Sequence, residues 1–203
     1  MYSQNNEDDF ILEYFKNKNN GVLIDIGAYD SKTFSNSKGL IEKGWKAYLI
    51  DASPFCTTKL FEVYKDNVNV YIIQSIITKQ KESGLISFYE APFSAVSSID
   101  KDHTKKYYES EERFKRESKE IFLTSLSINE LLEFVKNREE CIDFISIDIE
   151  GYSAELAMSI DKEIVKPDCI CIEHDNKKNN ILNYFKEYKE NLCNGENLII
   201  TKI

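Results

Sequence analysis

Three acidic residues stand at or near the ends of short apolar segments in this chain. Asp25 lies inside one such segment, Asp51 follows a second, and Asp148 lies near the end of a third. Segments of this kind are typical of strands that are buried on both faces of a parallel sheet. Ligands bind at the carboxyl ends of such strands, and a buried carboxylate is costly unless it binds something. The pattern therefore indicates a ligand-binding edge of an α/β sheet.

The segment around Asp25 has the composition of a ligand-binding turn. A predicted strand, Val22–Ile26, is followed by Gly27, which permits a sharp turn or a close approach of a ligand to the backbone. An amphipathic segment then ends at Gly44, a plausible helix C-cap. Strand, glycine turn and helix together form the nucleotide-facing corner of a doubly wound sheet. An ordinary strand–helix turn is the alternative interpretation.

The position of Asp51 favours a contact with ribose. It closes the second predicted strand, where a carboxylate is well placed to accept hydrogen bonds from both ribose hydroxyls. The alternative is a helix cap, because Asp51 precedes Ala52, Ser53 and a proline. The third predicted strand ends near Ser75, and such a strand end commonly lies beside an adenine ring.

Further polar residues cluster after the later strands. Asp148 and Glu150 flank the end of segment 142–149, which predicts a catalytic or metal-binding role for Asp148, with a helix cap as the alternative. Segment 168–173 ends in Glu173 and is followed by His174, Asp175 and Asn176. Four consecutive polar side chains at a strand end form either a solvated turn or a site.

Length and composition narrow the class of protein. The chain has 203 residues, about one domain, with 42% hydrophobic residues and a net charge of −9. An acidic surface repels phosphate backbones, so bulk nucleic-acid binding is not expected. No apolar segment approaches the ~20 residues that a membrane span needs. The five cysteines include no Cys-x-x-Cys pair and no signal peptide is evident, so we expect a reducing, cytoplasmic setting.

Strand and helix patterns alternate along most of the chain. We expect one domain over 1–203, with an N-terminal helix within 1–20 and an insertion at 85–126 that forms a substrate rim or a plain surface loop. The charged part of this insertion, 101–119, reads as a solvated helix or a substrate lid. Asn194-Gly195 predicts a hairpin turn before the last strand.

Taken together, the motifs resemble those of the FkbM family of S-adenosylmethionine-dependent methyltransferases. The motifs are Ser3-Gln4 with Glu7-Asp8, the run Asp25-Ile26-Gly27-Ala28-Tyr29-Asp30, Ser35-Asn36, Glu42-Lys43-Gly44-Trp45, Leu49-Ile50-Asp51-Ala52-Ser53-Pro54, the run from Asp143 to Gly151, and Ile172-Glu173-His174. They follow the family order across almost the whole chain. Two positions depart from the family: Ser31 stands where glycine is frequent, and Asp51-Ala52 stands where Glu-Pro is frequent.

The resemblance implies a Rossmann-like methyltransferase fold with a seven-stranded, mostly parallel sheet whose last strand is antiparallel. It implies S-adenosylmethionine as cofactor and a sugar, glycan or natural-product hydroxyl as acceptor. Gln4 and Glu7 either cap the first helix or lie near the cofactor. The implied cofactor-binding residues are Gln4, Glu7, Asp25, Gly27, Ala28, Tyr29, Asp30, Ser35, Asn36, Asp51, Ala52, Ser53, Ser75, Ile76 and Asp148.

Methyl transfer to a hydroxyl requires alignment and a group that takes the acceptor proton. The catalytic candidates are Asp148, Glu150 and His174; the histidine is the natural base, because its ordinary pKa is about 6.5. The competing hypothesis uses Mg²⁺ on Asp148, Asp175 and Asn176, whose oxygens are hard ligands.

Two other functions compete with methyl transfer. A non-catalytic cofactor-binding or interaction module would keep the same fold. A nicotinamide-dependent oxidoreductase is disfavoured, because positions 29 and 32 are Tyr and Lys where Gly-x-Gly-x-x-Gly requires glycine.

Overall fold

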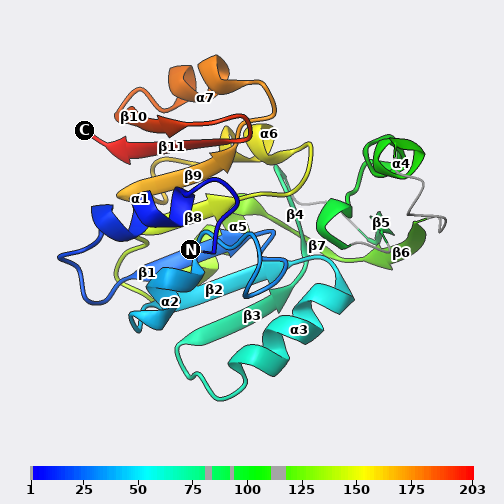
Figure 1. Ribbon diagram of the computed structural model, residues 1–203, viewed down its shortest axis with the longest axis horizontal. Coiled ribbons are helices and arrows are strands. Elements are labelled where there is room, and N and C mark those ends of the chain that lie inside the picture. The colour runs from blue at the N-terminus through cyan, green and yellow to red at the C-terminus, as the bar shows by residue number, and fades with distance from the viewer. Residues whose placement is uncertain (1, 81–83, 92–93, 111–117) are drawn as a thin grey trace.

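A seven-stranded sheet forms the centre of the computed structural model, which describes residues 2–80, 84–91, 94–110 and 118–203 (Figure 1). The strands lie in the order β10-β11-β9-β8-β1-β2-β3, and only β11 runs opposite to the others. This confirms the predicted mostly parallel sheet with an antiparallel last strand. The strands are β1 (Val22–Ile26), β2 (Lys46–Asp51), β3 (Val70–Gln74), β8 (Phe144–Ile147), β9 (Cys169–Glu173), β10 (Tyr188–Cys193) and β11 (Asn197–Lys202).

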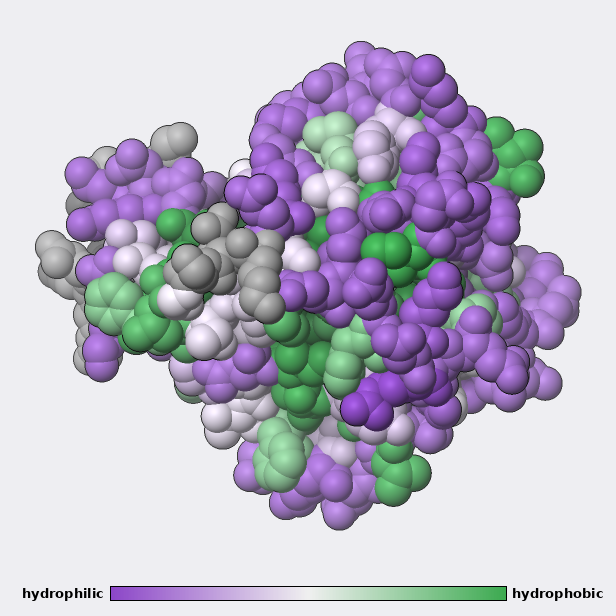
Figure 2. Space-filling model, turned by 180° about the vertical axis from the view of Figure 1, so that it is seen from behind, coloured by the Kyte–Doolittle hydropathy of each residue, from purple (hydrophilic) through white to green (hydrophobic). Residues whose placement is uncertain are grey.

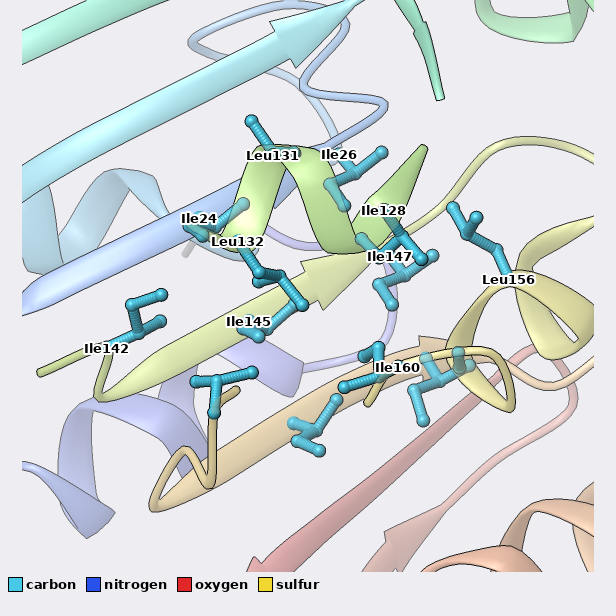
Figure 3. Packing of buried hydrophobic residues seen from close by; sticks show 14 of the residues in the cluster. Ile24, Ile26, Ile128, Leu131, Leu132, Ile142, Ile145, Ile147, Leu156 and Ile160 are labelled. Carbon is cyan, nitrogen blue, oxygen red and sulfur yellow. The ribbon is translucent and has the colours of Figure 1, made fainter. Parts of the chain in front are cut away.

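Helices cover both faces of this sheet, because successive residues of each strand point to opposite sides. In β1, Ile24 and Ile26 belong to one buried cluster and Leu23 belongs to the other. Figure 3 shows Ile24 and Ile26 near isoleucines of β8 and leucines of α5. The first cluster contains residues of α5 (Ile128–Lys136), α6 (Ser153–Ala157) and α7 (Lys178–Tyr184), and the second contains residues of α1 (Glu7–Tyr14), α2 (Lys38–Glu42) and α3 (Pro54–Tyr64).

Local sequence signals set where these helices begin. The Ser53 side chain accepts a hydrogen bond from the Cys56 N–H, with Pro54 in the first turn of α3. Ser127 and Glu130 form a capping box at the start of α5. The N-terminal helix is shorter than the predicted region 1–20, because Asn6 has a left-handed backbone with φ 68° immediately before α1.

The insertion lies beyond the carboxyl ends of the parallel strands (Figure 1). Most of the predicted charged segment 101–119 is α4, and the remainder falls largely on 111–117, outside the described residues. Seen from the opposite side, hydrophilic residues cover most of the surface and the insertion projects at one side (Figure 2). The elements here are β4 (Ile76–Thr78) paired with β7 (Ser125–Ser127), β5 (Ile86–Glu90) paired with β6 (Lys119–Leu123), a 3₁₀ turn at Ser94–Val96, and α4 (Lys101–Ser110).

None of the helices within the described ranges is both long enough and apolar enough to cross a membrane.

Candidate functional site

A pocket lies at the carboxyl ends of β1, β2 and β8. Open α/β sheets bind their ligands at such strand ends. The sheet supplies one wall and the insertion supplies another. Its lining residues are Ile26, Gly27, Tyr29, Ile50, Asp51, Ala52, Ser75, Ile76, Ile77, Phe88, Ala95, Ser97, Ser98, Ile99, Asp148, Ile149, Glu150 and Tyr152.

Gly27 is required by the way the strand ends meet at this pocket. It has a φ of +83°, and a Cβ atom on it would lie 1.7 Å from the Asp148 carbonyl oxygen. The Asp148 N–H donates to the Ile26 carbonyl at 2.9 Å, which holds the two strand ends together. Any side chain at Gly27 would therefore force β1 and β8 apart at the site.

Asp51 is held at the pocket wall by the backbone on both sides of it. One carboxylate oxygen accepts the Tyr29 N–H at 2.9 Å, and the other accepts the Ser53 N–H at 2.8 Å. Loss of hydration raises the pKa of Asp51 to about 6, against the lowering effect of these two bonds. Since Ser53 caps α3, Asp51 is not the helix cap. Each of its oxygens retains a lone pair for a ligand hydroxyl.

Asp148 lines the pocket. Within the described part of the chain, no group donates a hydrogen bond to its carboxylate. Loss of hydration raises the pKa of Asp148 well above its usual range, and the nearby carboxylates of Glu173 and Glu150 raise it further. A ligand with positive charge or a hydrogen-bond donor would offset both the lost hydration and the repulsion from the nearby carboxylates.

Comparison with protein families gives a match to the methyltransferase FkbM domain over residues 25–195. The chain belongs to the FkbM methyltransferase family. Comparison with curated protein sequences finds no match. Among solved structures, precorrin 8W decarboxylase of Methanobacterium thermoautotrophicum is similar over 100% of this chain and 92% of that chain, with 13% identity and a TM-score of 0.47.

The predicted residues divide into two groups in this FkbM family fold. Gly27, Tyr29, Asp51, Ala52, Ser75, Ile76, Asp148 and Glu150 line the pocket. Gln4, Glu7, Asp25, Ala28, Asp30, Ser35, Asn36 and Ser53 do not line it.

Asp25 is turned away from the pocket by the alternation along β1. Its side chain lies on the same side of the sheet as Leu23, where it accepts the Ser37 hydroxyl at 2.5 Å. Burial raises the pKa of Asp25 to about 6, against the lowering effect of Ser37 and Ser146. Asn36 donates to the Ser146 hydroxyl at 3.3 Å. In this structure these polar residues join α2 to β1 and β8 beneath the pocket.

The N-terminal residues bind the closing hairpin. Glu7 is fully buried, and its carboxylate accepts hydrogen bonds from Asn194 at 2.7 Å and from Asn197 at 2.9 Å. Gln4 donates to Glu196 at 3.1 Å. These hydrogen bonds join the first residues of the chain to the β10–β11 hairpin.

His174, the predicted base, lies outside the pocket lining in this structure. Its Nδ1 accepts the Asn176 N–H at 3.1 Å, so Nε2 carries the proton and donates to the Asn194 carbonyl at 3.2 Å. Both ring nitrogens are thus occupied by backbone groups, and His174 does not line the pocket. The polar cluster after β9 is a hydrogen-bonded turn.

Of the residues predicted to hold Mg²⁺, Asp175 and Asn176 belong to the hydrogen-bonded turn after β9. The Asp175 carboxylate accepts the Ala154 N–H at 2.9 Å, at the start of α6. Asp175 and Asn176 both have left-handed backbones in the turn, with φ 47° and 58°. Over the residues that the structure describes, no three His, Cys, Asp or Glu side chains gather as metal ligands.

The insertion contributes residues to the pocket wall, among them Ser97 and Ser98 of the loop in which the sequence suggests a substrate rim, and a contact to Glu150 that the sequence does not indicate. Phe88, Ser97 and Ser98 line the pocket, and His103 approaches Glu150 with 3.1 Å between Nε2 and Oε2. The hydrogen bond that His103 donates to Glu150 raises the pKa of His103, against the lowering effect of burial. These contacts join segments about fifty residues apart, which periodicity cannot detect. The one sequence signal for this contact was Gly151, because a glycine lets another group approach the backbone closely.

Proposed function

We propose that this FkbM family protein binds S-adenosylmethionine in the pocket and methylates a hydroxyl of a sugar, glycan or other natural product. The observation that carries the proposal is the contrast between two carboxylates on one pocket wall. Asp51 is fixed by two backbone N–H groups, and Asp148 has no protein donor within the described residues. The first suits a ribose diol and the second suits a cationic centre.

The lining residues fit the parts of this cofactor. Asp51 would accept the ribose hydroxyls, and Ser75 with Ile76 would border the adenine ring. Gly27 and Tyr29 would lie toward the methionine part, with Asp148 near the sulfonium. The cofactor, when bound, supplies a methyl group whose carbon–sulfur electron pair returns to sulfur as the acceptor oxygen forms the new bond.

The charge of the pocket supports a cationic ligand. Three carboxylates line it, from Asp51, Asp148 and Glu150, and none of its described lining residues is Lys, Arg or His. A sulfonium is stabilised by such surroundings, whereas the pyrophosphate of a nicotinamide dinucleotide would be repelled. Transfer of the positive methyl group to oxygen also leaves the acceptor proton for a nearby carboxylate to take.

Two measurements on the intact chain test the proposal. Calorimetric titration with S-adenosylhomocysteine should show one binding site per chain. Radiolabelled S-adenosylmethionine should then label a hydroxyl acceptor from a panel of sugars and glycans, with the label released by conditions that cleave ethers and not by those that cleave esters. Absence of binding would overturn the proposal. Binding with no acceptor labelled would favour a non-catalytic module of the same fold.

A further inference from the structure

The loop that follows β8 has an unusual backbone at the pocket. Glu150 has a φ of 46° and Gly151 has a φ of +83°. A left-handed backbone is disfavoured for a residue such as glutamate, and it persists only where surrounding contacts enforce it. The loop therefore depends on neighbours that hold it.

The insertion supplies those neighbours. A Cβ atom at Gly151 would lie 2.9 Å from Nδ1 of His103, so only glycine leaves room for the ring. The Ser98 hydroxyl donates to the Glu150 carbonyl at 3.2 Å and accepts the Asp100 N–H at 3.1 Å. Asp100 in turn accepts the His103 N–H at 3.2 Å. These bonds tie the start of α4 to both the backbone and the side chain of Glu150.

A second, open groove adjoins the cofactor pocket on this side. It is lined by Tyr89, Ser98, Ile99, Asp100, Lys101, Glu150, Gly151 and Tyr152. Four of these residues also line the pocket: Ser98, Ile99, Glu150 and Tyr152. Glu150 thus lies at the boundary between the two spaces, where an acceptor hydroxyl would meet the donor.

We propose that this groove receives the acceptor, that Glu150 takes the proton of its hydroxyl, and that His103 is a positioning residue that orients Glu150. The inference rests on the proposed methyl transfer. The acceptor O–H bond breaks, its proton passes to the Glu150 carboxylate, and an oxygen electron pair forms the new bond to the methyl carbon. The proton then leaves to solvent through the open groove.

The charge of His103 should tune this step. Among the described residues, the carboxylates of Glu150, Glu173 and Asp100 favour its protonated form, and burial opposes it. A protonated ring and the acceptor hydroxyl compete for the Glu150 carboxylate. A neutral ring still donates from Nε2 and orients the carboxylate without that effect. Turnover should therefore rise as pH increases through the pKa of His103.

The contact between His103 and Glu150 is testable without any ligand. The chain has two histidines, so NMR titration of the ring signals gives two curves, and His103→Gln assigns them. We expect His103 to titrate above its ordinary pKa of about 6.5 and to return toward that value in Glu150→Gln. Glu163→Gln, at a side chain 89% exposed, is the matched control and should change neither curve. An unchanged His103 curve in Glu150→Gln would overturn the proposal.

The pH profile of turnover then separates positioning from a structural role. His103→Gln keeps a donor and loses the titration, so the low-pH fall in turnover should flatten while the high-pH rate changes less than about threefold. His103→Ala should lose roughly ten- to a hundredfold in kcat with S-adenosylhomocysteine affinity unchanged. A wild-type pH step in His103→Gln would contradict the proposal. Failure of the proposed function would appear differently, as loss of cofactor binding in the unaltered chain.

Discussion

Carboxylates at the two ends of the parallel strands differ in their partners. The N-terminal strand ends form the amino edge of the sheet, and the C-terminal strand ends form its carboxyl edge. At the amino edge, the buried Asp143 accepts hydrogen bonds from Lys18 at 2.5 Å and from the Val22 N–H at 2.8 Å. Glu139 nearby accepts from Lys46 at 2.7 Å and from the Tyr48 hydroxyl at 3.0 Å. At the carboxyl edge, Asp148 faces an open pocket, and no such cation pairs with it among the residues that the structure describes.

The difference separates groups that hold the fold from groups that are available to a ligand. A carboxylate with a paired cation and backbone donors contributes to stability, and removing one partner leaves a buried charge. A carboxylate whose pKa is raised by loss of hydration weakens the fold at neutral pH. Such a group at a pocket is a sign of function. The comparison therefore predicts that amino-edge substitutions change stability and carboxyl-edge substitutions change binding or turnover.

The largest effect should come from Asp143→Ala at the amino edge. It removes the acceptor for Lys18 and for the Val22 N–H, so the free energy of unfolding should fall by about 3 kcal/mol. Chemical denaturation with urea measures this value. Calorimetry on the folded variant should show unchanged S-adenosylhomocysteine affinity. A tenfold loss of affinity at unchanged stability would break the distinction between the edges.

Asp148→Asn should have the reverse outcome. Removing the negative charge beside the donor should lower kcat by about a hundredfold, in the range that electrostatic groups at reacting centres contribute. The same change removes a carboxylate that is costly to ionise, so the melting temperature should stay equal or rise. The variant and the unaltered chain are compared both in kcat and in the melting temperature of thermal unfolding. A large fall in melting temperature would show that Asp148 acts in folding.

Asp51→Asn should weaken S-adenosylhomocysteine binding by about ten- to thirtyfold. The amide keeps one acceptor oxygen and loses the charge that strengthens hydrogen bonds from the ribose hydroxyls. In this variant the side-chain NH₂ group would also face one of the two backbone N–H groups, which misdirects the side chain. Calorimetric titration gives the ratio directly, and an unchanged affinity would argue against ribose at this position.

The smallest effect should come from Asp25→Asn, and it should depend on pH. The folded pKa of about 6 exceeds the ordinary value of 3.8, so wild-type stability falls as pH rises from about 4 to 6. The variant lacks this loss and should be more stable by about 1–2 kcal/mol at pH 7, after the weaker bond to Ser37 is deducted. At pH 4 the difference should nearly vanish. Denaturation at the two pH values measures this difference in stability. An equal difference at both values would contradict the predicted pH dependence.

Regular features of the fold followed from the sequence. The apolar run of β1, Gly27 and the Asn194-Gly195 turn each reflect short-range rules on burial and backbone geometry, and the structure has the strand, the turn and the antiparallel final strand that they predict. Asp51 lies at the pocket, as expected of a residue that ends a parallel strand. Family motifs extended these rules over most of the chain.

The side of the sheet that a polar residue faces was harder to predict. Asp25 lies one position from the strand end, so alternation turns it toward α2. His174 looked available after a strand, but two backbone groups of a turn occupy its ring. His103 gained its place only through packing of the insertion onto Gly151. Such contacts depend on tertiary structure, and no local pattern in a single sequence reveals them.

The central claim is that Asp51 and Asp148 serve one donor pocket. A crystal structure of the chain with S-adenosylhomocysteine tests it most directly. We predict the ribose hydroxyls within hydrogen-bond distance of the two Asp51 carboxylate oxygens, and the sulfur beside Gly27 and Asp148. A ligand bound elsewhere, or bound here with its ribose away from Asp51, would contradict the account.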